Sequence, residues 1–114
     1  MKKITVIVRN LPLNTRRNAE ALRMSVGLTL RDDKVSVIFI DDGVYSATQL
    51  KPELIKFPNL KQEFGALSML NCTMLADRLS LEKRGIIDLQ KNIKSVGQNI
   101  IVKTIAEADI VITF

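Results

Sequence analysis

The sequence contains a single cysteine, Cys72, and a thiol is well suited to nucleophilic chemistry near neutral pH. An apolar stretch over residues 66–71 precedes it and predicts a core strand, although the same stretch also fits a helix. The pattern over residues 73–83 is helical, so we expect Cys72 where a strand ends and a helix begins. Unpaired N–H groups at a helix N-terminus lower the pKa of a thiol by favouring the thiolate. The pattern therefore predicts an activated cysteine.

Two arginines that follow the cysteine, Arg78 and Arg84, are candidates to strengthen the positive field around a Cys72 thiolate. A lone cysteine beside a core strand is also commonly a small buried filler without chemistry. The pair Arg84-Gly85 has an equally simple explanation, because a basic residue and a glycine are typical of a helix C-terminus. Both interpretations of Cys72 remain open on the residues alone.

A second group of candidates is expected at one edge of the sheet, because ligands of open parallel sheets bind beyond the carboxyl ends of the strands. Asn10 follows the first predicted strand, and Asp41, Asp42 and Gly43 follow the second. Adjacent carboxylates can hold a metal or transfer protons, but Asx-Gly is also ordinary turn chemistry, which we favour here. The sequence has neither a GxGxxG pattern nor a Walker-type loop. We therefore expect no cofactor and no metal.

Composition removes several classes of function. The chain has no histidine, which excludes Ser-His and Cys-His nucleophile pairs within it and every histidine-ligated metal site. One cysteine excludes an internal disulfide and suits a reducing compartment, so we expect a cytoplasmic protein. No apolar run approaches the roughly 18 residues that span a bilayer, so no membrane partner is expected. The net charge of +5 comes from scattered basic residues without an aromatic platform, which argues against direct nucleic-acid binding.

The chain alternates strand and helix patterns from end to end. Apolar, largely β-branched runs predict strands at 3–9, 35–40 and 109–114, with further strands expected at 66–71 and 99–103. Helices are predicted from Thr15 to about Leu30, over 73–83 and over 88–96. Shorter helical pieces are expected at 44–50, between Pro52 and Pro58, and at 59–64, where Gly65 ends the turn. This order predicts one domain over residues 1–114, a three-layer α/β/α sandwich with a mainly parallel, about five-stranded, flavodoxin-like sheet.

Several segments in this order resemble the DsrE/DsrF/DsrH-like family, which includes sulfur-relay subunits of the TusB, TusC and TusD type. The likeness lies in ALRMSVGLTLRDDKVSVIFIDDGVYSA (21–47), the position of Cys72, RGI (84–86) and EADIVITF (107–114). DDGVY looks most like the DsrF and TusC branch. The resemblance implies a small flavodoxin-like fold and assembly as trimers or hexamers, sometimes from different subunits.

The same resemblance implies a sulfur chemistry for some members, which pass sulfane sulfur along as a cysteine persulfide. The family's acceptor cysteine ends a core strand just before a helix that leads to Arg-Gly, and Cys72 with Arg84-Gly85 downstream matches that description. The interval between Cys72 and Arg84 is longer than in the compact family form. Several branches lack the acceptor cysteine and serve as structural subunits.

Three functions therefore compete. The first is a sulfurtransferase-like relay, in which the Cys72 thiolate takes the outer sulfur of a donor persulfide and a cysteine of an acceptor protein removes it. The second is a non-catalytic subunit or adaptor of a homo- or hetero-oligomer, with Cys72 in the core. The third is a small-ligand or nucleotide-binding module that uses the crevice at the strand ends. The sequence names neither the sulfur donor nor the acceptor.

Overall fold

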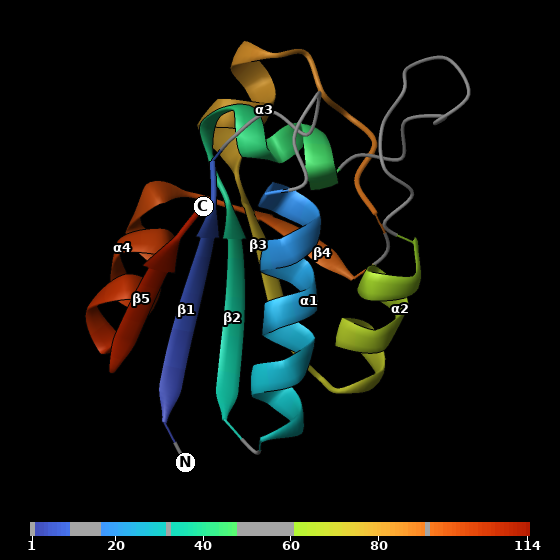
Figure 1. Ribbon diagram of the computed structural model, residues 1–114. Coiled ribbons are helices and arrows are strands. Elements are labelled where there is room, and N and C mark those ends of the chain that lie inside the picture. Colours follow the sequence, from blue (N-terminus) through green and yellow to red (C-terminus); the bar gives the residue numbers. More distant parts are fainter. Residues whose placement is uncertain (1, 10–16, 32, 48–60, 91) are drawn as a thin grey trace.

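The fold is a five-stranded parallel sheet between two helical layers (Figure 1). A computed structural model describes residues 2–9, 17–31, 33–47, 61–90 and 92–114. The strands are β1 (Lys3–Val8), β2 (Lys34–Phe39), β3 (Thr73–Asp77), β4 (Ile93–Val96) and β5 (Ile110–Thr113), in the spatial order β4-β3-β2-β1-β5. The α/β/α sandwich and the parallel sheet predicted from the sequence are confirmed.

Two helices, α1 (Arg17–Leu30) and α2 (Lys61–Met69), cover one face of the sheet, and α4 (Gln98–Glu107) lies on the other. Alternate residues of β2 show this division: Val37 and Phe39 pack with the α1 side, whereas Ile38 packs with Ile101 of α4. The α1 side holds most of the core. Central parallel strands buried on both faces explain why β1 and β2 are almost continuous aliphatic runs.

The strand predicted at 66–71 is wrong, and the helical alternative for this stretch is the correct one. Helix α2 continues through Gly65 to Met69, because a glycine inside a helix costs only about 1 kcal/mol and Leu67 becomes fully buried in the core. Asn71, with φ of 58°, ends the helix in a left-handed conformation. The chain then needs only one more residue before the third strand begins at Thr73.

The long helix predicted over 73–83 is therefore half wrong. Its first half is β3, whose Met74, Leu75 and Ala76 are buried in the middle of the sheet. Its second half is a short helix, α3 (Arg78–Lys83), capped by Asp77. The sequence pattern failed here because a short strand buried on both faces carries no alternation that distinguishes it from a helix.

The last two internal elements were predicted with their types exchanged. The helix predicted at 88–96 is wrong, and the edge strand β4 lies there with Lys94 and Ser95 exposed. The strand predicted at 99–103 is part of α4, which packs Ile101 and Ile105, four residues apart, against the sheet. The short helix predicted at 44–50 is present to Ala47 as the 3₁₀ helix η1 (Asp41–Ala47). Thr15, the segment between Pro52 and Pro58 and the first two residues of the helical piece predicted at 59–64 lie outside the described residues. Among the residues that the structure describes, no helix is long and apolar enough to cross a bilayer.

Candidate functional site

The carboxyl ends of β2 and β3 bring together several polar residues that are far apart in the sequence. After β2 the chain turns through Asp41, which has φ of 49°, into η1. Helix η1 packs directly onto the end of β1, since a Cβ atom on Gly43 would lie 1.9 Å from the carbonyl oxygen of Val8. Only glycine fits there. This close approach fixes where Asp41 and Asp42 stand relative to the neighbouring strand.

A buried hydrogen-bond network joins the ends of these two strands. The Ser80 hydroxyl donates to Asp77 Oδ2 at 2.6 Å and accepts the backbone N–H of Asp41 at 3.0 Å. The backbone N–H of Ser80 also donates to Asp77 Oδ2, at 3.3 Å, which makes Asp77 the N-cap of α3. Asp77 and Ser80 are both buried. The network therefore holds the turn after β2 against the first turn of α3.

An ion pair closes the outer side of this network. Arg84 donates from Nε and Nη2 to Asp42 Oδ1, at 3.1 and 3.0 Å, and from Nη1 to the carbonyl oxygen of Ser80 at 3.2 Å. Gly85 follows with φ of 64°, so it ends α3 as expected of a C-terminal glycine. The structure thus brings Asp41, Asp42, Gly43 and Arg84 to one place. Their grouping fixes the backbone at this edge.

Asp77 is the functional-site candidate that the sequence did not reveal. Its Oδ1 atom is buried and has no hydrogen-bond partner among the described residues. A buried carboxylate oxygen without a partner is uncommon in folded proteins, and it can accept a hydrogen bond from a bound group. The site offers a fixed acceptor at Asp77 and a paired guanidinium at Arg84, but no thiol. No three metal-ligating side chains converge in the part of the chain that the structure describes.

The placement of Cys72 at the end of a strand and the start of a helix is wrong. Cys72 follows α2 and precedes β3, so it lies at the amino edge of the sheet, roughly 16 Å along β3 from Asp77. Its N–H donates to the carbonyl oxygen of Leu67 at 3.0 Å within the C-terminal turn of α2. This is the negative end of a helix dipole, which disfavours a thiolate. The error follows directly from the misplaced third strand.

The Cys72 thiol is held in its protonated form. Its Sγ donates to the carbonyl oxygen of Val35 at 3.2 Å, and the side chain packs against the main core while keeping partial exposure. Burial raises the pKa of the Cys72 thiol to about 12, although a hydrogen bond from the backbone of Val37 opposes the shift. At pH 7 a thiol with this pKa is almost entirely protonated.

The remaining predicted residues are separated from the thiol. Arg84 is committed to Asp42, and Arg78 is exposed at the start of α3, so both lie at the carboxyl edge. Asn10 lies outside the described residues. Sequence reasoning did not select Asp77. The signal that could have revealed it is the interval between Cys72 and Arg84, which is longer than in the compact family form and so indicates that the strand ends after Cys72. Measured from the true end of β3, the interval to Arg84-Gly85 contains only α3.

Comparison with known proteins gives a consistent match. The family model described as DsrE/DsrF-like family matches residues 2–114. The crystal structure of the YchN protein from E. coli is similar over 100% of both chains, with a TM-score of 0.86 and 20% sequence identity. At that identity the likeness concerns the fold. A search among curated proteins finds no match.

Proposed function

Because this chain belongs to the DsrE/DsrF-like family, which is associated with sulfur relay, we propose that it serves a relay assembly as a structural subunit that does not itself carry the persulfide. One observation carries the proposal. The family's acceptor cysteine ends a core strand just before a helix that leads to Arg-Gly. In this chain the residue that ends β3 and precedes the short helix to Arg84-Gly85 is Asp77, a carboxylate, and the single cysteine lies at the opposite edge of the sheet. A carboxylate cannot accept sulfane sulfur from a persulfide.

The environment of Cys72 also argues against transfer through it. Persulfide transfer begins when a thiolate attacks the outer sulfur of a donor persulfide and the donor thiolate leaves. The Cys72 thiol has a pKa of about 12, donates to a backbone carbonyl and stands at the negative end of α2. Each of these features favours the protonated form. A core cysteine with these contacts fits a filler better than a carrier.

Persulfide relay through Cys72 is the rival function, and the partial exposure of its side chain is the observation that favours it. In that case a donor protein in the cytoplasm would have to reach the amino edge of the sheet, and its docking would have to lower the pKa of the thiol by several units. The acceptor would also be another protein, since the chain has no second cysteine.

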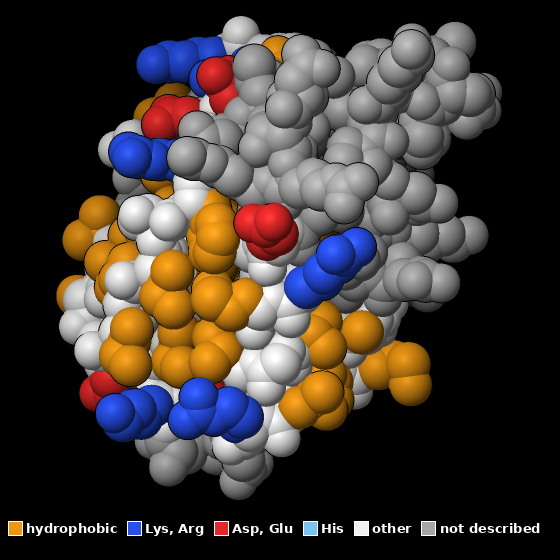
Figure 2. Space-filling view, in the orientation of Figure 1, with side chains coloured by type: hydrophobic (Ala, Val, Ile, Leu, Met, Phe, Trp, Pro, Cys, Tyr) orange, Lys and Arg blue, Asp and Glu red, His pale blue; other side chains and the backbone are white. Residues whose placement is uncertain are grey.

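The exposed apolar surface supports a subunit function. Figure 2 shows hydrophobic side chains gathered on the side of the molecule where β1 and β5 lie. Four exposed apolar residues belong to two consecutive elements at this end of the sheet: Ile100 and Val102 on α4, and Ile110 and Val111 on the edge strand β5, where Val111 shares the face that α4 covers and Ile110 the opposite face. We call these four residues the α4/β5 surface. Exposed apolar residues beside an unpaired strand edge favour contact with another chain, which we take to be a second copy of this one.

Intact-mass spectrometry after incubation with a low-molecular-weight persulfide tests the proposal. We compare the wild type with Cys72→Ser and with a Cys72→Ser/Met69→Cys variant, whose new thiol replaces a side chain that is 85% exposed. The exposed thiol at position 69 is the positive control for the reagent. We expect a reducible sulfur adduct on this control and almost none on the folded wild type, because its thiolate is scarce.

Two further results bear on the outcome. Wild-type protein unfolded in urea should gain the adduct, which would show that the fold protects Cys72. An adduct that forms on folded wild type as fast as on the position-69 control, and that is absent from Cys72→Ser, would overturn the proposal in favour of relay through Cys72.

A further inference from the structure

One half of a sheet face is polar where a parallel sheet is normally apolar. On the α4 side, the amino halves of three neighbouring strands present two rows of polar residues in register. Lys3 of β1 pairs with Lys34 of β2, and in the next row Ser36 of β2 lies between Thr5 of β1 and Thr73 of β3. The α1 side of the same strand segments carries Ile4, Val35 and Met74, all buried. The polar character is therefore confined to one face.

The two exposed lysines lie directly opposite one another on neighbouring strands. Like charges directly opposite one another on paired strands destabilise a sheet. Neither Lys3 nor Lys34 forms an ion pair with a described residue. The nearby carboxylate of Asp109 accepts the backbone N–H of Lys3 at 2.8 Å and not its ammonium group. A bound anion would relieve this repulsion.

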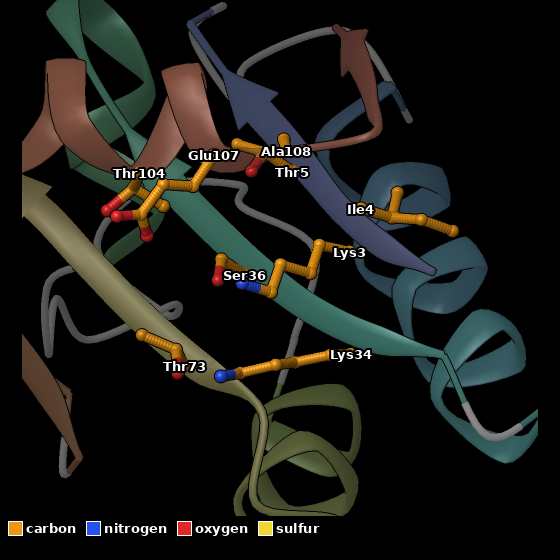
Figure 3. A pocket seen from close by; sticks show the side chains of 9 residues that line it. All are labelled: Lys3, Ile4, Thr5, Lys34, Ser36, Thr73, Thr104, Glu107 and Ala108. Atoms are coloured by element: carbon orange, nitrogen blue, oxygen red, sulfur yellow. The ribbon is translucent and has the colours of Figure 1, made fainter. Parts of the chain in front are cut away.

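A cavity of about 190 Å³ lies over these rows. Figure 3 shows the side chains of Lys3, Lys34, Ser36 and Thr73 coming from three strands into the same space, with Thr104 and Glu107 of α4 along its other wall. The hydroxyls of Ser36 and Thr73 make no hydrogen bond to a described residue, so their donors are available. The volume is below the roughly 300 Å³ at which pockets for drug-sized ligands begin, which indicates a small ligand.

We propose that this cavity binds a small tetrahedral oxyanion of the phosphate class, either inorganic phosphate or the terminal phosphate of a small molecule. The two ammonium groups supply charge-assisted hydrogen bonds, and the Ser36 and Thr73 hydroxyls donate to the remaining oxygens. The site lies at the amino edge of the sheet, so it is separate from the Asp77 network and independent of the proposed subunit function.

Glu107 gives the site a preference among oxyanions. Its carboxylate lines the same cavity and forms no ion pair with a described residue. A carboxylate repels an oxyanion without protons, whereas it can accept a hydrogen bond from one that keeps a proton. Near pH 7 inorganic phosphate keeps a proton, a phosphate monoester with a second pKa of about 6 keeps one in only a minority of molecules, and sulfate keeps none. The cavity is therefore expected to favour inorganic phosphate over sulfate, with phosphate monoesters between the two.

Isothermal titration of the folded protein with inorganic phosphate, sulfate and glycerol phosphate, at constant ionic strength, tests this site. Lys34→Gln is expected to weaken phosphate binding at least tenfold, and Lys3→Gln to do the same. Lys94→Gln is the matched control, because Lys94 is an exposed lysine of β4 that does not line the cavity. Glu107→Gln is expected to bring sulfate binding up to the level of phosphate.

The two phosphate compounds and the lysine variants distinguish a specific site from general charge screening. Binding of glycerol phosphate but not of inorganic phosphate would assign the site to phosphate monoesters. Equal weakening by Lys94→Gln and Lys34→Gln would mean that phosphate screens general surface charge, and would overturn the proposal. No heat of binding for either phosphate compound, in protein whose unfolding transition is unchanged, would overturn it as well.

Discussion

The position of Cys72 relative to β3 decides the reactivity of its thiol. At the carboxyl end of β3 a cysteine would face the positive end of a helix, but at the amino end it faces the negative end of α2 and a backbone carbonyl. The five residues from Thr73 to Asp77 separate these two environments. The same thiol is therefore suited to packing and poorly suited to nucleophilic attack.

The raised pKa of Cys72 predicts an alkaline loss of stability. An unfolded cysteine has a pKa of about 8.5, whereas the folded value is about 12, so between these pH values the folded state holds a proton that the unfolded state has lost. The stabilisation is complete below pH 8.5 and declines as pH rises toward 12. At pH 10 the wild type should have lost about 2 kcal/mol relative to its own value at pH 8, beyond any loss shown by Cys72→Ala.

Urea denaturation of both proteins across this pH range measures the effect. A wild-type curve that runs parallel to that of Cys72→Ala up to pH 10 would show that the thiol ionises in the folded protein as easily as in the unfolded one. That result would also remove the main objection to relay through this residue.

Among the elements, those whose patterns were unambiguous could be predicted from sequence. Strands β1 and β2 are long aliphatic runs between turn residues, and α1 has helical spacing, so these three elements and the last strand needed no tertiary information. From α2 to α4 the types depended on packing. Gly65 did not stop a helix, and the β-branched run in α4 formed a helix because Ile101 and Ile105 face the sheet.

Individual residues of the candidate site could be predicted from the sequence, but the contacts between them could not. Asp41, Asp42, Gly43 and Arg84 were each selected from sequence, but the Arg84–Asp42 ion pair joins residues 42 positions apart. Local patterns do not specify such a pairing. The Asp77–Ser80 cap could have been found from the Asp-x-x-Ser spacing, had the preceding residues been taken as a strand.

Two glycines give a matched test of the element packing. Gly43→Ala should destabilise the protein by about 3 kcal/mol or more, because the new Cβ would meet the Val8 backbone at 1.9 Å and displace η1 from β1. Gly65→Ala should stabilise it by about 0.5–1 kcal/mol, since a Cβ in α2 meets nothing within 4 Å and alanine favours the helix. Chemical denaturation gives both values. Similar effects from the two substitutions would contradict the packing of η1.

For the molecule as a whole, we predict self-association through the α4/β5 surface. We expect the purified chain to elute from a sizing column, with mass measured by light scattering, as an oligomer. Val111→Glu should shift it toward monomer, because a charge would be buried without a partner at the contact. Ile87→Glu is the control, since Ile87 is 92% exposed and lies away from α4 and β5 in the sequence. A monomeric wild type, or equal effects of both variants, would refute this contact.

We infer that the fold keeps its single thiol protonated and therefore outside sulfur transfer. The most direct measurement is the rate of alkylation of folded wild type by iodoacetamide as a function of pH, followed by intact mass. We expect a slow rate that rises about tenfold per pH unit through pH 10 without levelling off. A rate that is fast near pH 7 and reaches its plateau at or below pH 8.5 would contradict it and identify Cys72 as an activated thiol.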